Sequence, residues 1–234
     1  MRVEIWSDIM CPFCYIGKRK FEAALSEFDH SEDIQVVWKS FQLNPAMKTE
    51  PDKNIHQYLA EHKGVSLQEA SQMNEHVTAM AREVGLEYNF DKAVVANSFD
   101  AHRLIQLAKK HGKGDEAEER LFRAYFTEGA NIADRITLTK VGEEIGLAAI
   151  DIENMFKEGT FAREVKDDIR EAQQIGVRGV PFFVLDRKYG VSGAQPSEVF
   201  LNALTQAYEE AKPPQITPVN TASGDACDVD GNCE

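Results

Sequence analysis

The sequence predicts an α/β protein in which a large all-helical insertion separates two parts of one sheet. Strand-like runs rich in β-branched and aromatic residues occur only near the two ends, at 2–7, 34–41 and 181–193. Helical periodicity fills the interval between about 55 and 175. A Cys-x-x-Cys pair, Cys11 and Cys14, joins the first strand to the first helix.

Composition fits a soluble globular protein and excludes several function classes. The 234 residues are 43% apolar and 28% charged, which is ordinary for a packed domain. A net charge of −13 argues against nucleic-acid and anionic-membrane partners. No stretch approaches the roughly 18 apolar residues of a membrane span. Acidic residues interrupt the first eight positions and no apolar signal region follows, so we expect a cytoplasmic location.

The first 54 residues predict a β-α-β unit. A strand at 2–7 leads into the cysteine turn, and a helix follows from Tyr15 to Phe28, with apolar residues at helical spacing. The run 34–41 predicts a second strand, which ends at Asn44-Pro45.

Residues 55–175 predict about six helices with a core of their own and no convincing strand. Ser66 and Glu69 form a capping box, and the helix that they begin stops at Gly85. Further helices are expected near 104–108, 121–125, 138–145 and 161–175, and Asp151 is expected to cap a short one.

The last part of the chain, 176–212, returns to the sheet. Residues 181–185 and 189–193 predict a hairpin, and 199–208 predict a final helix. The stretch 213–234 is rich in Pro, Thr, Ser, Gly and Asp, which is typical of a flexible tail.

The cysteine pair is the strongest chemical signal. Two thiols three residues apart at the first turn of a helix can close a disulfide without backbone movement. Unpaired N–H groups and the positive end of the helix dipole favour the thiolate of Cys11, so we expect its pKa to fall below about 8.5. The alternatives are a structural pair in the core and one half of a zinc site.

Five motifs in a fixed order resemble the DsbA-like branch of the thioredoxin superfamily. They are SDIMCPFCYIG (7–17), FQLNP (41–45), NSFDAHRL (97–104), GVRGVP (176–181) and SGAQ (192–195). The closest resemblance is to its FrnE-type subgroup, which is related to 2-hydroxychromene-2-carboxylate isomerases and kappa-class glutathione transferases. It implies a thioredoxin-like fold over 1–54 and 176–212, with the helical insertion domain at 55–175.

The resemblance also implies roles for individual residues. Cys11 is the nucleophile and Cys14 the resolving thiol. Pro181 is similar to the family's cis-proline, which would present the backbone of Val180 to an extended substrate chain.

Asn97, Ser98 and His102 match a motif that faces the active site in relatives. His102 could tune Cys11, or it could be a hydrogen-bonded residue at a domain seam. Asp8 and Lys18 flank the cysteine motif, and we expect both to be solvated charges.

A second cysteine pair, Cys227 and Cys233, lies in the tail, and an Asp-Gly turn could bring its sulfurs together. Some FrnE-like proteins carry a tail pair that relays electrons to the first pair, and this one is similar. The alternatives are an inert reduced tail and a calcium loop, and the chain stops too early for a full EF-hand loop.

The leading hypothesis is a cytoplasmic protein thiol–disulfide oxidoreductase, with isomerase activity as an option. Its partners would be protein or peptide thiols and disulfides and a recycling thiol, with no cofactor or metal. One alternative is a glutathione-dependent isomerase or transferase, but such relatives commonly carry Ser where Cys11 stands. Another is a zinc-binding stress sensor that uses all four cysteines.

Overall fold

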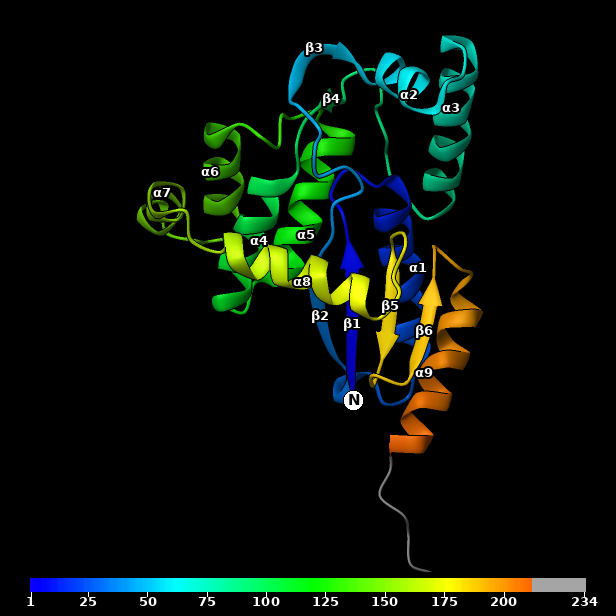
Figure 1. Ribbon diagram of the computed structural model, residues 1–234. Helices are drawn as coiled ribbons and strands as arrows, with labels where there is room; N and C mark the ends of the chain where they lie inside the picture. The colour runs from blue at the N-terminus through cyan, green and yellow to red at the C-terminus, as the bar shows by residue number, and fades with distance from the viewer. Residues whose placement is uncertain (212–234) are drawn as a thin grey trace, which may run out of the picture.

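A mixed four-stranded sheet unites the first and last parts of the chain in the computed structural model, which describes residues 1–211 (Figure 1). Its strands are β1 (Arg2–Ser7), β2 (Gln35–Ser40), β5 (Phe182–Leu185) and β6 (Tyr189–Ser192), in the order β2-β1-β5-β6. β1 pairs in parallel with β2 and antiparallel with β5, and β5 pairs antiparallel with β6. The expected β-α-β unit and C-terminal hairpin are confirmed.

Successive side chains of β1 point to opposite faces of the sheet. Val3 and Ile5 join Phe183 and Phe200 in a core under α1 (Pro12–Glu27) and α9 (Ser197–Ala211). Trp6 points to the other face, where it packs with Ala172 and Val177. Ala172 belongs to α8 (Ala162–Gln174), so this last helix of the expected insertion also covers the sheet (Figure 1). Both faces are thereby removed from water, as buried parallel strands require.

The helices between the two halves of the sheet lie above its upper edge and to its left in Figure 1. They are α2 (Ile55–Lys63), α3 (Leu67–Glu83), α4 (Phe99–Lys110), α5 (Gly114–Phe122), α6 (Arg135–Glu144) and α7 (Ala149–Glu158). The Ser66 capping box at the start of α3 is confirmed, because Ser66 Oγ accepts from Glu69 N–H at 3.2 Å and Glu69 Oε2 accepts from Ser66 N–H at 2.8 Å. A short 3₁₀ turn at Ser31–Asp33 precedes β2.

Two local expectations are wrong. The helical part contains β4 (Val94–Val95), which pairs with β3 (Glu50–Asn54). Two residues are too few to show a strand's alternation, so the sequence carries no signal for β4. Ala148, and not Asp151, occupies the N-cap position of α7, and Asp151 lies in the first turn, where the helix dipole still favours a carboxylate.

The cysteine turn is continuous with the core of the helical part. Cys11, Cys14 and Tyr15 belong to the same buried cluster as Leu104 of α4 and Phe122 of α5. A π-helical turn, Arg123–Thr127, follows α5 and carries Tyr125 and Phe126 into this cluster. Such turns are rare and often mark functional sites. Within residues 1–211, no helix combines the length and apolarity that crossing a membrane demands.

Candidate active site

The two cysteines occupy the turn from β1 to α1, as the sequence predicts. Cys11 is the N-cap residue of α1 and Pro12 the first helical residue, a position where the missing N–H of proline costs nothing. The Cys11 N–H donates to the Asp8 carbonyl at 2.9 Å, and the Cys14 N–H donates to the Cys11 carbonyl at 3.0 Å. Both thiols are free, so the structure represents the reduced pair.

Cys11 faces the loop that precedes β5. Its thiol donates a hydrogen bond to the Val180 carbonyl, with 3.4 Å between sulfur and oxygen. The Val180-Pro181 peptide bond is cis, as expected. Both cysteines are buried, and Cys11, at 4% exposed against 1% for Cys14, is the more exposed of the two. Cys11 and the exposed Phe13 both line the adjoining pocket described below.

Gly17 permits the close approach between α1 and this loop. A Cβ atom at Gly17 would lie 2.9 Å from Pro181 Cγ, closer than real Cβ contacts come. Pro181 in turn accepts from the Gly193 N–H at 2.9 Å, which ties the loop to the end of β6. The glycine in the motif CPFCYIG therefore sets the distance between Cys11 and Val180.

Cys14 lies one turn further into α1 and is inaccessible. Burial raises the pKa of the Cys14 thiol well above its ordinary value, and the neighbouring Cys11 raises it further. The Asp8 backbone and the Ser7 hydroxyl lower it only in part. Cys14 therefore remains a neutral thiol at neutral pH, whereas Cys11 is the sulfur that borders the pocket.

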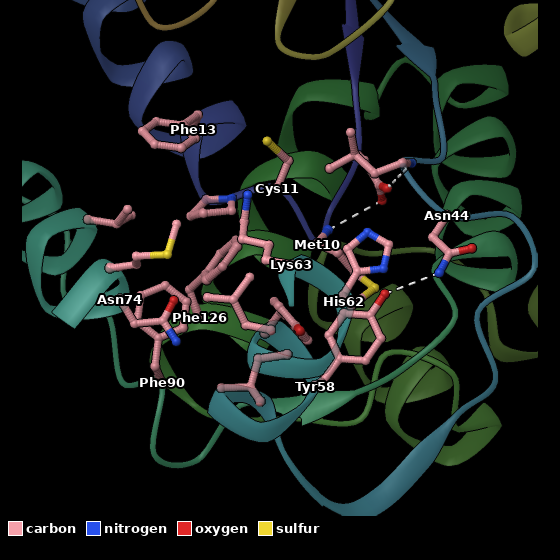
Figure 2. Close-up of a pocket in the computed structure, with 18 of the residues that line it drawn as sticks. Met10, Cys11, Phe13, Asn44, Tyr58, His62, Lys63, Asn74, Phe90 and Phe126 are labelled. Carbon is pink, nitrogen blue, oxygen red and sulfur yellow. Dashed lines mark hydrogen bonds between the residues drawn. The ribbon is translucent and has the colours of Figure 1, made fainter. Parts of the chain in front are cut away.

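A pocket of about 510 Å³ opens beside Cys11 (Figure 2). Its wall is formed by the cysteine turn, the loop after β2, helices α2 and α3 and the π-helical turn, together with Phe90 and Ser98. The lining is mainly apolar and aromatic, and Figure 2 shows Phe13, Tyr58, Phe90 and Phe126 around it. This volume falls in the range of small-molecule sites in proteins.

Asp8 is buried, so the expectation of a solvated charge is wrong. Its side chain is 2% exposed and accepts from the N–H groups of Leu43 at 2.8 Å and Met10 at 3.3 Å. His102 Nε2 lies 3.4 Å from Asp8 Oδ1. The carboxylate thus joins the cysteine turn, the loop after β2 and helix α4, three segments that are far apart in sequence.

Lys18 is also buried, contrary to expectation. Its ammonium group is surrounded by Glu22, Asp115 at 3.2 Å and Glu119 at 3.3 Å. Burial alone would lower the pKa of Lys18, but these carboxylates outweigh it and the pKa is raised. Lys18 therefore keeps its charge while it links α1 to α5.

The sequence motif 97–104 contributes unequally to the site. Ser98 lines the pocket. Asn97 holds the loop after β2, because its Nδ2 donates to the Met47 carbonyl at 2.8 Å and its Oδ1 accepts from Gln42 at 3.1 Å. His102 is completely buried beside Asp8, outside the pocket wall, and neither ring nitrogen has a hydrogen-bond partner within residues 1–211.

Several pocket residues carry no recognisable sequence signal. Tyr58, Lys63 and Met73 lie on α2 and α3, where their spacing is that of ordinary amphipathic helices. Tyr88, which is not part of the lining, supports it: its hydroxyl donates to the Pro12 carbonyl at 2.6 Å and its ring stacks on Phe126, with 4.6 Å between ring centroids. Only the tertiary structure reveals that these side chains meet at Cys11.

Cys227 and Cys233 lie outside the described residues. In the part that the structure describes, no three His, Cys, Asp or Glu side chains group as a metal site would need. A zinc site built from both cysteine pairs would depend on the tail.

Comparison with known proteins agrees with this geometry. Residues 2–205 match the family model described as a DSBA-like thioredoxin domain. A probable DsbA oxidoreductase from Streptomyces coelicolor is 39% identical, with a TM-score of 0.86 and coverage of 100% of this chain and 98% of that one. An uncharacterised Bacillus subtilis protein, YwbO, is 28% identical over 210 residues, which are 88% of this chain and 96% of that protein.

More distant structures share the fold. The cytosolic disulfide reductase DsbM from Pseudomonas aeruginosa is 21% identical, with a TM-score of 0.63 and coverage of 90% of this chain and 100% of that one. A 2-hydroxychromene-2-carboxylate isomerase is 13% identical, with a TM-score of 0.66 and coverage of 90% and 97%. The resemblance drawn from the five sequence motifs is confirmed, and the chain belongs to the DsbA-like thioredoxin-domain family.

Proposed function

We propose that this DsbA-like thiol–disulfide oxidoreductase exchanges disulfides with protein or peptide substrates through Cys11. One observation carries the proposal. The Cys11 sulfur lies at the N-terminus of α1, borders an open pocket and contacts the Val180 carbonyl, while Cys14 is enclosed behind it. One sulfur is therefore placed to meet substrate and the other to resolve the product.

The chemistry follows from this division of roles. In reduction, the Cys11 thiolate attacks one sulfur of a substrate disulfide and expels the other as a thiolate, which takes up a proton. Cys14 then gives up its proton and attacks Cys11 Sγ, which forms the Cys11–Cys14 disulfide and releases the second substrate thiol. Oxidation is the reverse sequence. In isomerisation, a different substrate thiolate expels Cys11, and no electrons are transferred overall.

The raised pKa of Cys14 fits the resolving role. A neutral Cys14 does not compete for substrate, and it does not repel the Cys11 thiolate. It becomes a nucleophile only when the mixed disulfide on Cys11 is within reach.

Val180 is proposed to hold an extended substrate chain. Its carbonyl accepts from the Cys11 thiol in the free protein, so a substrate N–H can replace that donor when the sulfur reacts. Pairing of this kind adds the substrate as a strand beside Val180 and Pro181. Ser98, at the pocket wall, is a further candidate contact, whereas Asn97 and His102 are proposed to position the surrounding loops.

Turnover needs an external thiol or oxidant to restore the pair. We propose that Cys227 and Cys233 can relay electrons between that reagent and Cys11. A reducing cytoplasm is the proposed location, because a labile pair would there be returned to its dithiol state.

The test is reduction of a protein disulfide in the presence of excess dithiothreitol. Cys11→Ser is expected to abolish turnover, and Cys14→Ser to accumulate mixed disulfides that mass spectrometry detects. Cys227→Ser is the matched control for loss of a sulfur elsewhere, and it is expected only to slow recycling.

Normal turnover by Cys11→Ser would refute the assignment of the nucleophile. A Cys11→Ser protein that still promoted a glutathione-dependent isomerisation would favour the isomerase alternative instead.

A further inference from the structure

The pocket beside Cys11 is unusually apolar and adaptable for a site that receives protein chains. Its aromatic walls come from the cysteine turn, α2 and the segment that follows α5. Three methionine side chains also line the pocket, and methionine adapts its shape to different apolar ligands. They are Met10, Met47 and Met73.

The pocket lining is not acidic, although the protein as a whole is. The chain carries a net charge of −13, yet the pocket lining holds one lysine, Lys63, and one carboxylate. Asp8 is the one carboxylate of the lining, and two backbone N–H groups already occupy it. Lys63 is exposed and has no carboxylate partner within residues 1–211. An anionic group could therefore pair with Lys63 without displacing another contact.

We propose that this pocket selects disulfides in which one sulfur carries a compact aromatic or branched apolar group with a carboxylate. This proposal rests on the function proposed above, and it specifies which class of disulfide reacts at the Cys11 sulfur. The apolar group enters the pocket and the carboxylate meets Lys63. Polar disulfides such as oxidised glutathione cannot bury comparable apolar surface there and react more slowly.

The proposed exchange requires only Cys11, Cys14 and the disulfide reagent. The Cys11 thiolate attacks the sulfur that carries the apolar group, so that group stays on Cys11 as a mixed disulfide inside the pocket. The second half of the reagent leaves as a thiolate. Cys14 then forms the Cys11–Cys14 disulfide and the apolar thiol departs, so the protein dithiol supplies the two electrons that the reagent accepts.

Three disulfide reagents test the selectivity: dithiobis(nitrobenzoate), which is aromatic and anionic, dithiodipyridine, which is aromatic and neutral, and oxidised glutathione. The protein is the full chain with Cys227→Ser and Cys233→Ser, so that only the Cys11–Cys14 pair reacts. For each reagent, the stopped-flow rate constant with the protein is divided by the rate constant of the same reagent with dithiothreitol. This division removes differences in the intrinsic reactivity of the reagents. The corrected rate is expected to be at least about tenfold higher for dithiobis(nitrobenzoate) than for glutathione.

Two variants assign the selectivity to the pocket. Lys63→Met is expected to lower the ratio of the corrected rate with dithiobis(nitrobenzoate) to that with dithiodipyridine about fivefold. This factor corresponds to the loss of one exposed ion pair. Lys157→Met is the matched control, because Lys157 also lies exposed in the last turn of a helix but far from the pocket lining, and it should leave the ratio unchanged. Met73→Trp fills the mouth and should lower both aromatic rates relative to glutathione.

A structural measurement complements the rates. Cys14→Ser treated with dithiobis(nitrobenzoate) retains the aromatic group on Cys11, and a crystal structure should place its ring in the pocket near Tyr58 and Phe126. A ring in solvent or along Val180, an unchanged ratio in Lys63→Met, or faster corrected reaction with glutathione would each overturn the proposal. These outcomes are separate from the proposed function, which fails only if Cys11→Ser keeps its turnover of protein disulfides.

Discussion

Individual residues around Cys11 owe their roles to close, specific contacts. Gly17 is required because Pro181 lies where its side chain would be, and this contact brings Val180 to the reactive sulfur. Asp8 is buried because backbone N–H groups on both sides of it need an acceptor. Neither role involves a reaction of the thiols, yet both determine which segments surround the two cysteines.

Gly17→Ala is predicted to destabilise the protein by about 1–3 kcal/mol, although alanine is the better helix former. The added methyl group pushes Pro181 away from α1, so thiol exchange should slow as well. Chemical denaturation and the protein-disulfide assay measure the two effects. In the control Gly179→Ala, the new methyl group meets no atom within 4 Å, so stability should change by less than about 0.5 kcal/mol. Equal stability of Gly17→Ala and the wild type would show that the contact is not tight.

Helix α5 makes polar contacts with both α1 and β2. Lys18 of α1 is paired with Asp115 and Glu119, and the Trp38 indole of β2 donates to Asp115 at 2.9 Å. Aromatic stacking runs beside these ion pairs, with 4.9 Å between the centroids of Tyr15 and Phe122. The helix also carries Glu118, a buried carboxyl whose Oε2 has no partner within residues 1–211.

Glu118 is predicted to make the stability of the protein fall as the pH rises through neutrality. Burial raises the pKa of Glu118 to about 8, so the folded protein keeps this group protonated while the unfolded chain ionises near 4.5. Between these values the unfolded state binds fewer protons, and stability is lost with increasing pH until about pH 8. Glu118→Gln should therefore be more stable than wild type at pH 8, by on the order of 3 kcal/mol, with little difference at pH 4.

Denaturant titrations at several pH values measure this difference. Glu116→Gln is the matched control, since Glu116 is exposed on the same helix and its substitution should change stability little at either pH. Equal stability of Glu118→Gln and wild type at pH 8 would contradict the prediction.

The whole molecule combines two parts that share one buried cluster at the cysteine turn, while the sheet has two further clusters of its own. The cysteine turn, which belongs to the sheet by topology, packs into the cluster that holds the helical part together. α8 closes the other face of the sheet, where Lys39 of β2 pairs with Asp168 at 2.8 Å. The cysteine turn therefore lies on a seam that both parts form together.

We predict that the sheet and the helical part unfold in one cooperative transition. Trp6 and Trp38 report on the sheet by fluorescence, whereas far-ultraviolet circular dichroism is dominated by the helices. The two signals should give the same midpoint in urea, because opening the seam would expose the shared core. Separate midpoints would mean that each part has a sufficient core of its own.

Local patterns in the sequence determined much of the fold and the reactive pair. Strand alternation, the Ser66 capping box and the Cys-x-x-Cys turn depend on neighbours within a few residues, and the structure agrees with each of them. Only the tertiary structure decided that Asp8 and Lys18 are buried, that Asn97 holds a loop, and that α2 and α3 build an apolar pocket at Cys11. These features arise where segments tens of residues apart meet, and the sequence spacing of charges and apolar side chains does not encode which partners they will find.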